Sequence, residues 1–171
     1  IRFDDDKVQI VGIHGRGPTG ARLFAEGTID PPTADSRYDI RVTATDVPMD
    51  DTLRGALLAS KGAALIDAVF SQKRFDELLA KGLVRPRAAP GAPGVPAGDT
   101  APTFEVFSGT IDSIQVHVTS GFGKEQPVHQ DIAVRFKDVN ALPDLFPYPL
   151  HGNDVAVRIG DDYIAVRGEG L

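Results

Sequence analysis

Apolar and polar residues alternate along most of this chain. The clearest run is RYDIRVTATDV, residues 37–47, in which every second residue from Tyr38 to Ala44 is apolar and the residues between them are polar. A period of two is typical of a β-strand that buries one face and exposes the other. The same period is found in four further segments, at residues 7–10, 22–29, 103–121 and 127–139. Aspartate, glycine and proline are concentrated between these segments, so we expect hairpins of antiparallel strands.

The period changes over residues 48–83. Pro48 cannot donate a hydrogen bond within a central strand, and Asp50 or Asp51 can cap the first turn of a helix. Apolar residues then recur at spacings of three and four in TLRGALL, in AALIDAV and more weakly in RFDELLA. We predict two or three short helices around residues 50–82.

These patterns predict a mainly β fold with a helical insert, of the α+β class. We expect a curved antiparallel sheet built from β-hairpins and partly covered by the helices, because a sheet with one apolar face needs a cover. A chain of 171 residues is long enough for one core, so we expect one β-rich unit, residues 1–171. Its expected segments are β-hairpins at 1–47, the helical insert at 48–83, a loop rich in proline, alanine and glycine at 84–102, and β-strands at 103–171.

The end of the chain repeats the pattern of its beginning. When Ile1 of IRFDDDKVQIVGIHG is placed on Val157 of VRIGDDYIAVRGEGL, one arginine, two aspartates and one glycine coincide, and so do four apolar positions. Both segments have the pattern of a strand, a tight acidic turn and a second strand. The offset is 157 − 1 = 156 residues, nearly the whole chain. We therefore interpret the sequence as one period of a tandem array, with the first hairpin of the next copy included.

Charge and composition exclude several classes of protein. The net charge is −6 and lysine and arginine form no cluster, which argues against a surface for nucleic acid. The chain has no cysteine, so disulfides, thiolate zinc sites and cysteine nucleophiles are excluded. Its longest apolar stretch, residues 63–70, is interrupted by Asp67 and is far shorter than the ~20 residues that cross a bilayer. We expect no nucleic-acid partner, and membrane association only through other parts of a parent protein.

The residues that could carry chemistry are scattered. The four histidines, His14, His117, His129 and His151, have no H-x-x-x-H or H-E-x-x-H spacing. His117 lies between two valines, which places it on the polar face of a strand, while His14 and His151 are expected in turns because a glycine follows each. The acidic run at residues 4–6 has no EF-hand spacing, and no G-x-S-x-G motif occurs. We expect no metal, no cofactor and no enzyme activity.

Two segments carry a resemblance to a known family. GARLFAEGTIDPPTADSRYDIRVTATDVPMDDTLRGAL contains a glycine hairpin, then the pattern Y-x-I-x-V-x-A-x-D-V-P-x-D-x-x-L at the start of a helix. LFPYPLHGNDVAVRIGDDYIAVRGEGL looks like the passage into a following hairpin. Together they resemble the repeating unit of AsmA-like bacterial envelope proteins, the group that includes TamB and YhdP. The resemblance implies a long groove-like β-sheet in the periplasm, with an apolar concave face that conducts lipids between membranes in outer-membrane biogenesis. The helical insert and the loop at 84–102 depart from a plain strand repeat, so this segment either lines the groove or decorates it.

The residues themselves lead to a compatible function. An apolar sheet face that helices cover only in part leaves a trough wide enough for an acyl chain. The candidate lipid-groove residues are Ile40, Val42, Ile114, Val116, Ile132 and Val134. We expect a non-enzymatic segment of an envelope repeat protein that binds or conducts lipid and contacts neighbouring repeats of the same chain.

Two alternatives stay open at this point. A structural or adhesive β repeat of an exported protein, without a ligand, would have a core filled by its own side chains. A closed antiparallel barrel that holds one small ligand would pair its first and last hairpins. In an array, the two matching hairpins should instead lie at opposite ends of the sheet.

Overall fold

The structure, a computed structural model, describes residues 1–4, 6–17, 19–33, 35–59, 63–86, 103–121, 126–145 and 148–169. The chain forms two compact units. Unit 1 contains Ile1–Pro48, Thr110–Asp138 and Asn153–Gly170, and unit 2 contains Met49–Gly109 and Val139–Gly152.

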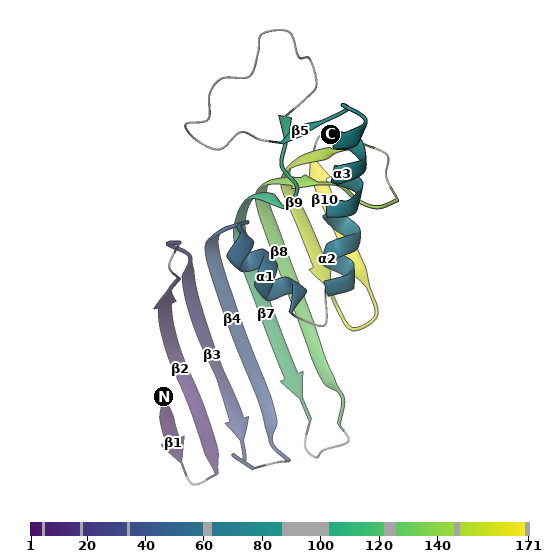
Figure 1. The fold of residues 1–171 in the computed structure, drawn as a ribbon. Coiled ribbons are helices and arrows are strands. Elements are labelled where there is room, and N and C mark those ends of the chain that lie inside the picture. Colours follow the sequence, from purple (N-terminus) through teal and green to yellow (C-terminus); the bar gives the residue numbers. More distant parts are fainter. Residues whose placement is uncertain are drawn as a thin grey trace. The chain divides into compact units, whose positions relative to one another are not determined.

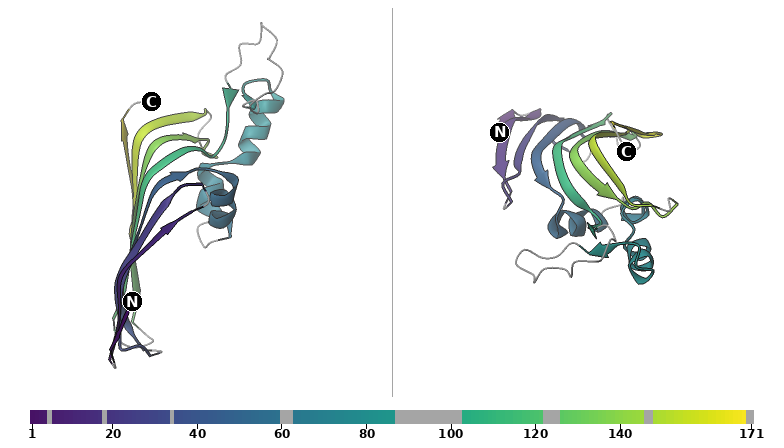
Figure 2. Two further views of the ribbon diagram at one scale, coloured as in Figure 1. Left: turned by 90° about the vertical axis from the view of Figure 1, so that its left-hand side faces the viewer. Right: turned by 90° about the horizontal axis from the view of Figure 1, so that it is seen from above.

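Unit 1 is built on an eight-stranded sheet (Figure 1). Its strands, in spatial order, are β1 (Arg2–Asp4), β2 (Lys7–Arg16), β3 (Arg22–Asp30), β4 (Arg37–Pro48), β7 (Ser108–Ser120), β8 (Val128–Ala141), β9 (Leu150–Ile159) and β10 (Ile164–Glu169). The pairs from β1 to β7 and the pair β9–β10 are antiparallel. The sheet is curved and open, with β1 and β10 at its two edges (Figure 2). The expected mainly β fold with a helical insert is confirmed, and the open sheet of the described strands excludes a closed barrel.

The strand register assigns the side chains of unit 1 to two faces. Val42 and Val116 are Cα partners across β4 and β7, and Arg41 and His117 are the partners next to them. Cα partners point to the same side of a sheet, whereas successive residues point to opposite sides. We call the side of Val42 and Val116 the apolar face and the side of Arg41 and His117 the polar face. His117 is thus on the same side as Arg41 and opposite to Val116, as its alternation predicts.

Strand β2 keeps these two faces by means of a β-bulge. Its register with β3 shifts between Ile10 and Ile13, so that Val11 and Gly12 stand opposite Glu26 alone. A shift of one residue reverses every side chain beyond it, so without the extra residue Ile13 would point to the polar face. With the bulge, Ile10 and Ile13 both lie on the apolar face.

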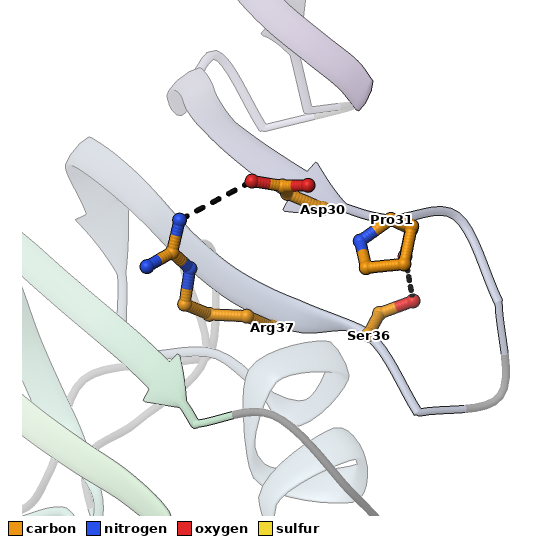
Figure 3. Close-up of polar contacts among 4 residues, drawn as sticks. All are labelled: Asp30, Pro31, Ser36 and Arg37. Carbon is orange, nitrogen blue, oxygen red and sulfur yellow. Dashed lines mark hydrogen bonds and ion pairs between the residues drawn. The ribbon is translucent and has the colours of Figure 1, made fainter. Parts of the chain in front are cut away.

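Polar contacts close the turn between β3 and β4 (Figure 3). The Asp30–Pro31 peptide is cis, and the Ser36 hydroxyl donates to the Pro31 carbonyl. Arg37 Nη2 lies 3.2 Å from Asp30 Oδ2, and these two residues are also the last Cα partners of the strand pair. The ion pair therefore joins β3 to β4 where their pairing ends.

Unit 2 contains the helical insert, with α1 (Asp51–Leu58), α2 (Ala63–Val69) and α3 (Gln72–Ala80). Asp50 is the N-cap of α1, because its carboxylate accepts from Leu53 N at 2.9 Å. Ser71 has the same role in α3 and accepts from Arg74 N at 3.2 Å. The expected two or three short helices, and a cap at Asp50 or Asp51, are confirmed. That these helices cover the sheet stays a prediction.

A small aromatic core holds unit 2 together. The rings of Phe70 and Phe107 meet edge to face with centroids 5.0 Å apart, and the Phe75 and Phe104 centroids are 6.4 Å apart. Leu142 is fully buried, and its backbone N–H donates to the Val69 carbonyl in the adjoining helix at 3.1 Å. The core thus joins helices to residues far away in the sequence.

This core interrupts one expected strand. The alternation over residues 103–121 predicts strand, and the structure divides this segment into a two-residue strand β6 (Thr103–Phe104) and β7, which starts at Ser108. Phe107 between them has a positive φ of 58°, which is incompatible with a strand. Strand β6 pairs in parallel with β5 (Arg85–Pro86), inside the segment expected to be loop. The rest of that loop, residues 87–102, lies outside the described residues.

Candidate functional site: an apolar sheet face

The six candidate groove residues come from three neighbouring strands. Ile40 and Val42 lie in β4, Ile114 and Val116 in β7, and Ile132 and Val134 in β8, and all six side chains are half-buried. Val42 and Val116 are partners, while Ile40 and Ile114 stand opposite Val118 and Ala44. The four residues of β4 and β7 therefore share the apolar face.

The β8 residues are assigned to a face by their polar neighbours. Asp131 and His117 line the same hollow, so Asp131 lies on the polar face with His117. Ile132 is the next residue and Val134 is two further along, which places both on the apolar face. The structure therefore brings all six candidates to one side of the sheet.

The apolar face extends beyond these six residues to both edges of the sheet. Toward one edge, Phe3 and Val8 are partners in β1 and β2; toward the other, Val157 and Val166 are partners in β9 and β10. Val157 lies next to Arg158, whose ion pair with Asp131 places it on the polar face, so the pair Val157–Val166 is on the apolar face. Phe3 is 78% exposed and Val166 is 69% exposed. Large apolar side chains thus remain accessible to solvent at both ends.

The opposite side of the same strands carries a polar hollow of about 280 Å³. It is lined by His117, Thr119, His129, Gln130, Asp131, Gly160, Asp161 and Tyr163. Asp161 makes two contacts in it: its carboxylate accepts from Gln130 N at 2.9 Å and lies 2.5 Å from His129 Nδ1. Asp161 belongs to the turn between β9 and β10, so these contacts attach that hairpin to β8.

Ion pairs and hydrogen bonds lower the pKa of three carboxylates on this face. Hydrogen bonds from the Arg158 guanidinium, at 2.6 and 2.9 Å, lower the pKa of Asp131. The backbone N–H of Gln130, and next His129, lower the pKa of Asp161. Arg135 lowers the pKa of Asp154 in the same way, through bonds of 2.7 and 3.0 Å. The charged groups are thus engaged with one another across strands.

Two histidines lie elsewhere than the sequence predicts. We expected His14 and His151 in turns, but His14 is inside β2 and His151 is inside β9. The glycines that follow them do not end the strands: Gly15 is a ladder residue opposite Leu23. The His14 ring packs beside Phe24 with centroids 4.9 Å apart, and His151 Nδ1 lies 2.8 Å from Asn140 Oδ1. Within the described part of the chain, no three histidine, aspartate or glutamate side chains gather as a metal site would require.

Sequence reasoning missed the cross-strand ion pairs, although the sequence contains a signal for them. Asp131 and Arg135 are four residues apart in β8, and Asp154 and Arg158 are four apart in β9. Antiparallel neighbours run in reverse order, so one register places both aspartates against both arginines. The structure has these two pairs, Arg135–Asp154 and Arg158–Asp131.

The fold and its two faces define an open, amphipathic antiparallel sheet with a separate helical unit. Neither a family model, nor a curated protein, nor a solved structure matches the chain. A search of the described helices finds none with the length and hydropathy of a membrane span.

Proposed function

We propose that this protein binds or conducts lipid acyl chains along its apolar sheet face and performs no covalent chemistry. The observation that carries the proposal is the continuity of that face across the strands of unit 1, with half-buried aliphatic residues in the middle and exposed ones at both edges. In line with the AsmA-like resemblance, the protein would act as a segment of a repeat protein in the periplasm or cell envelope of a bacterium. Its partners would be lipid and neighbouring repeats.

The chemistry of the face fits an acyl chain. Each methylene group removed from water contributes about 0.8 kcal/mol, and an extended chain can contact several strands in turn. Val42 and Val116 form the centre of such a path, since Ile40 and Ile114 flank them on the same side. Recognition of this kind requires contact area and no particular polar residue, which accounts for the lack of a motif.

A second candidate is a structural repeat without a ligand. The pairs Arg135–Asp154 and Arg158–Asp131, together with His129–Asp161, favour it, because they join neighbouring strands of the sheet through the protein's own side chains. It differs from the first candidate in one expectation: the apolar face would take up no lipid.

The test compares matched substitutions on the two faces of one strand. Val42→Asp puts a charge on the apolar face, and Thr43→Asp puts the same charge on the polar face one residue away. Each variant is mixed with phosphatidylethanolamine–phosphatidylglycerol vesicles that contain a fluorescent phospholipid, and uptake into the soluble protein is measured. Circular dichroism confirms that both variants are folded.

We expect the wild type and Thr43→Asp to take up lipid and Val42→Asp to lose at least about 10-fold in affinity, the effect of roughly 1.4 kcal/mol. Lipid extraction and mass spectrometry of the protein purified from a bacterial host supply an independent measurement. A wild-type protein that carries no lipid and takes none from vesicles would leave the structural repeat as the better explanation.

A further inference from the structure

The two hairpins with related sequences also have the same strand register. In β1–β2, Arg2 pairs with Gln9 and Phe3 pairs with Val8. The positions 156 residues later pair in the same way, Arg158 with Ala165 and Ile159 with Ile164. The match continues into the turn. Asp4 pairs with Lys7, and at the equivalent positions 156 residues later Gly160 N donates to the Tyr163 carbonyl at 2.9 Å. Sequence similarity at four identical positions thus corresponds to equivalent backbone pairing.

The equivalent strands have different neighbours. Strand β2 lies between β1 and β3, while its counterpart β10 is the edge strand next to β9. One edge of β2 pairs with β1 and the other edge pairs with β3. The edge of β10 that is equivalent to this second edge has no strand beside it among the described residues. An exposed strand edge presents N–H and C=O groups that can pair with another strand.

We infer that the outer edge of β10 is a docking site for a strand with the sequence pattern of β3, supplied by a second copy of this protein's repeat. The register of β2 on β3 fixes how that strand would lie. Val8 and Ile10 pair with Ile29 and Gly27, so Ile164 and Val166 would pair with Ile29 and Gly27 of the added copy. The inference rests on the proposed function only in treating the chain as one unit of a repeating sheet.

Charge favours this partner strand. Val11 stands opposite Glu26 at the β2 bulge, and the residue at the equivalent position in β10 is Arg167. Arg167 would therefore face Glu26 of the added copy on the polar face. Within the described part of the chain neither side chain forms an ion pair, so both are available for this contact.

The geometry also identifies which amides would engage. Gly160 and Tyr163 form a hydrogen-bonded pair, and hydrogen-bonded and non-hydrogen-bonded pairs alternate along antiparallel strands. Ala165 therefore directs its N–H toward β9, whereas Ile164 and Val166 direct theirs outward. Addition of a strand should protect the amides of Ile164 and Val166 and leave that of Ala165 as it is.

The test is a tandem protein in which residues 1–168 are followed directly by residues 13–171. This junction keeps β10 up to Gly168, the counterpart of Gly12, and puts Ile13 in the place of Glu169. Amide hydrogen exchange is compared between the single chain and the tandem. We expect the amides of Ile164 and Val166 to exchange at least about 100-fold more slowly in the tandem, and that of Ala165 to change little.

Two variants of the tandem serve as a matched pair. Val166→Pro removes the outward N–H without touching a bond to β9, whereas Val166→Ala keeps that N–H. Protection of Ile164 should be lost in the first and kept in the second. A folded tandem in which Ile164 and Val166 exchange as fast as in the single chain overturns the inference.

A second measurement needs no fusion. A synthetic peptide of residues 22–30 is added at millimolar concentration to the isotope-labelled single chain. The amide resonances of Ile164 and Val166 should shift, and a peptide with Glu26→Lys should shift them less. If the unchanged peptide shifts neither resonance, the inference is overturned, even if the tandem is insoluble. Lipid uptake by the single chain is measured separately. If the amides of Ile164 and Val166 are protected in the tandem but the single chain takes up no lipid, only the proposed function is contradicted.

Discussion

Gly27, in the middle of β3, is the position where a small substitution should be most damaging to the sheet. It lies between Ile10 of β2 and Ile40 of β4. A Cβ atom at Gly27 would overlap the Asp39 carbonyl and lie 2.8 Å from Ile40 Cα. Carbon atoms normally approach to ~3.5–4.0 Å, so β3 and β4 would have to separate locally by roughly 1 Å.

The cost of Gly27→Ala follows from that separation. Overpacking against backbone costs about 1–3 kcal/mol, and weakening one or two neighbouring ladder hydrogen bonds adds about 1 kcal/mol each. We expect a total of about 3 kcal/mol. With a urea dependence of about 2 kcal/mol per molar, the unfolding midpoint should fall by about 1.5 M.

Gly15→Ala is the matched control, since Gly15 is also inside a strand of the same sheet. A Cβ atom there would lie 3.6 Å from Leu23 Cβ, an ordinary contact. Because glycine in a strand costs conformational entropy, this variant should be neutral or about 0.5 kcal/mol more stable. Urea unfolding followed by circular dichroism compares the two. Equal midpoints for Gly27→Ala and Gly15→Ala would refute the close approach of β3 to β4.

Three further predictions concern unit 2 and the polar face. Leu142→Ala should cost about 3–4 kcal/mol because Leu142 is fully buried, whereas Leu145→Ala, at a residue 99% exposed, should change little; equal urea midpoints would contradict the core described here. Ser71→Ala removes the cap of α3 and should lower the free energy of unfolding by about 1 kcal/mol, with reduced helix content as the second readout. The pKa of Asp161 is held below its usual 3.8, so its carboxylate stabilises the fold above that pH and the contribution is lost as pH falls through the lowered value. Thermal unfolding between pH 6 and pH 3 should therefore depend less on pH in Asp161→Asn than in Asp162→Asn, and identical profiles would show that Asp161 has no such role.

The sheet was predictable because its determinants are local. The alternation in residues 37–47 is a property of neighbouring residues, and it identified both the strand β4 and the side of it that carries Val42. The same holds for α1, where Pro48 and Asp50 mark the boundary by their backbone chemistry. These features depend on no distant part of the chain.

The features that sequence reasoning missed depend on distant residues or on one extra residue. Phe107 lies between β6 and β7 and packs against Phe70, while Phe104 ends the short strand β6 and packs against Phe75; both partners are about thirty to forty residues earlier in the sequence. The bulge at Gly12 cannot be recognised in β2 alone, because it exists only relative to β3. The side of β8 that carries Ile132 follows from local sequence, because residues 131–137 alternate without a break.

The ion pairs of the polar face and the composition of the apolar face are connected through strand register. Asp131 and Arg135 of β8 meet Arg158 and Asp154 of β9 in one register only. A slip by one residue would break both pairs and turn residues such as Ile132 toward the polar side. Exposed ion pairs contribute little free energy one by one, so their main effect here is to disfavour the slipped register. The side chains that a lipid would contact are therefore selected, in part, by charges on the opposite side of the sheet.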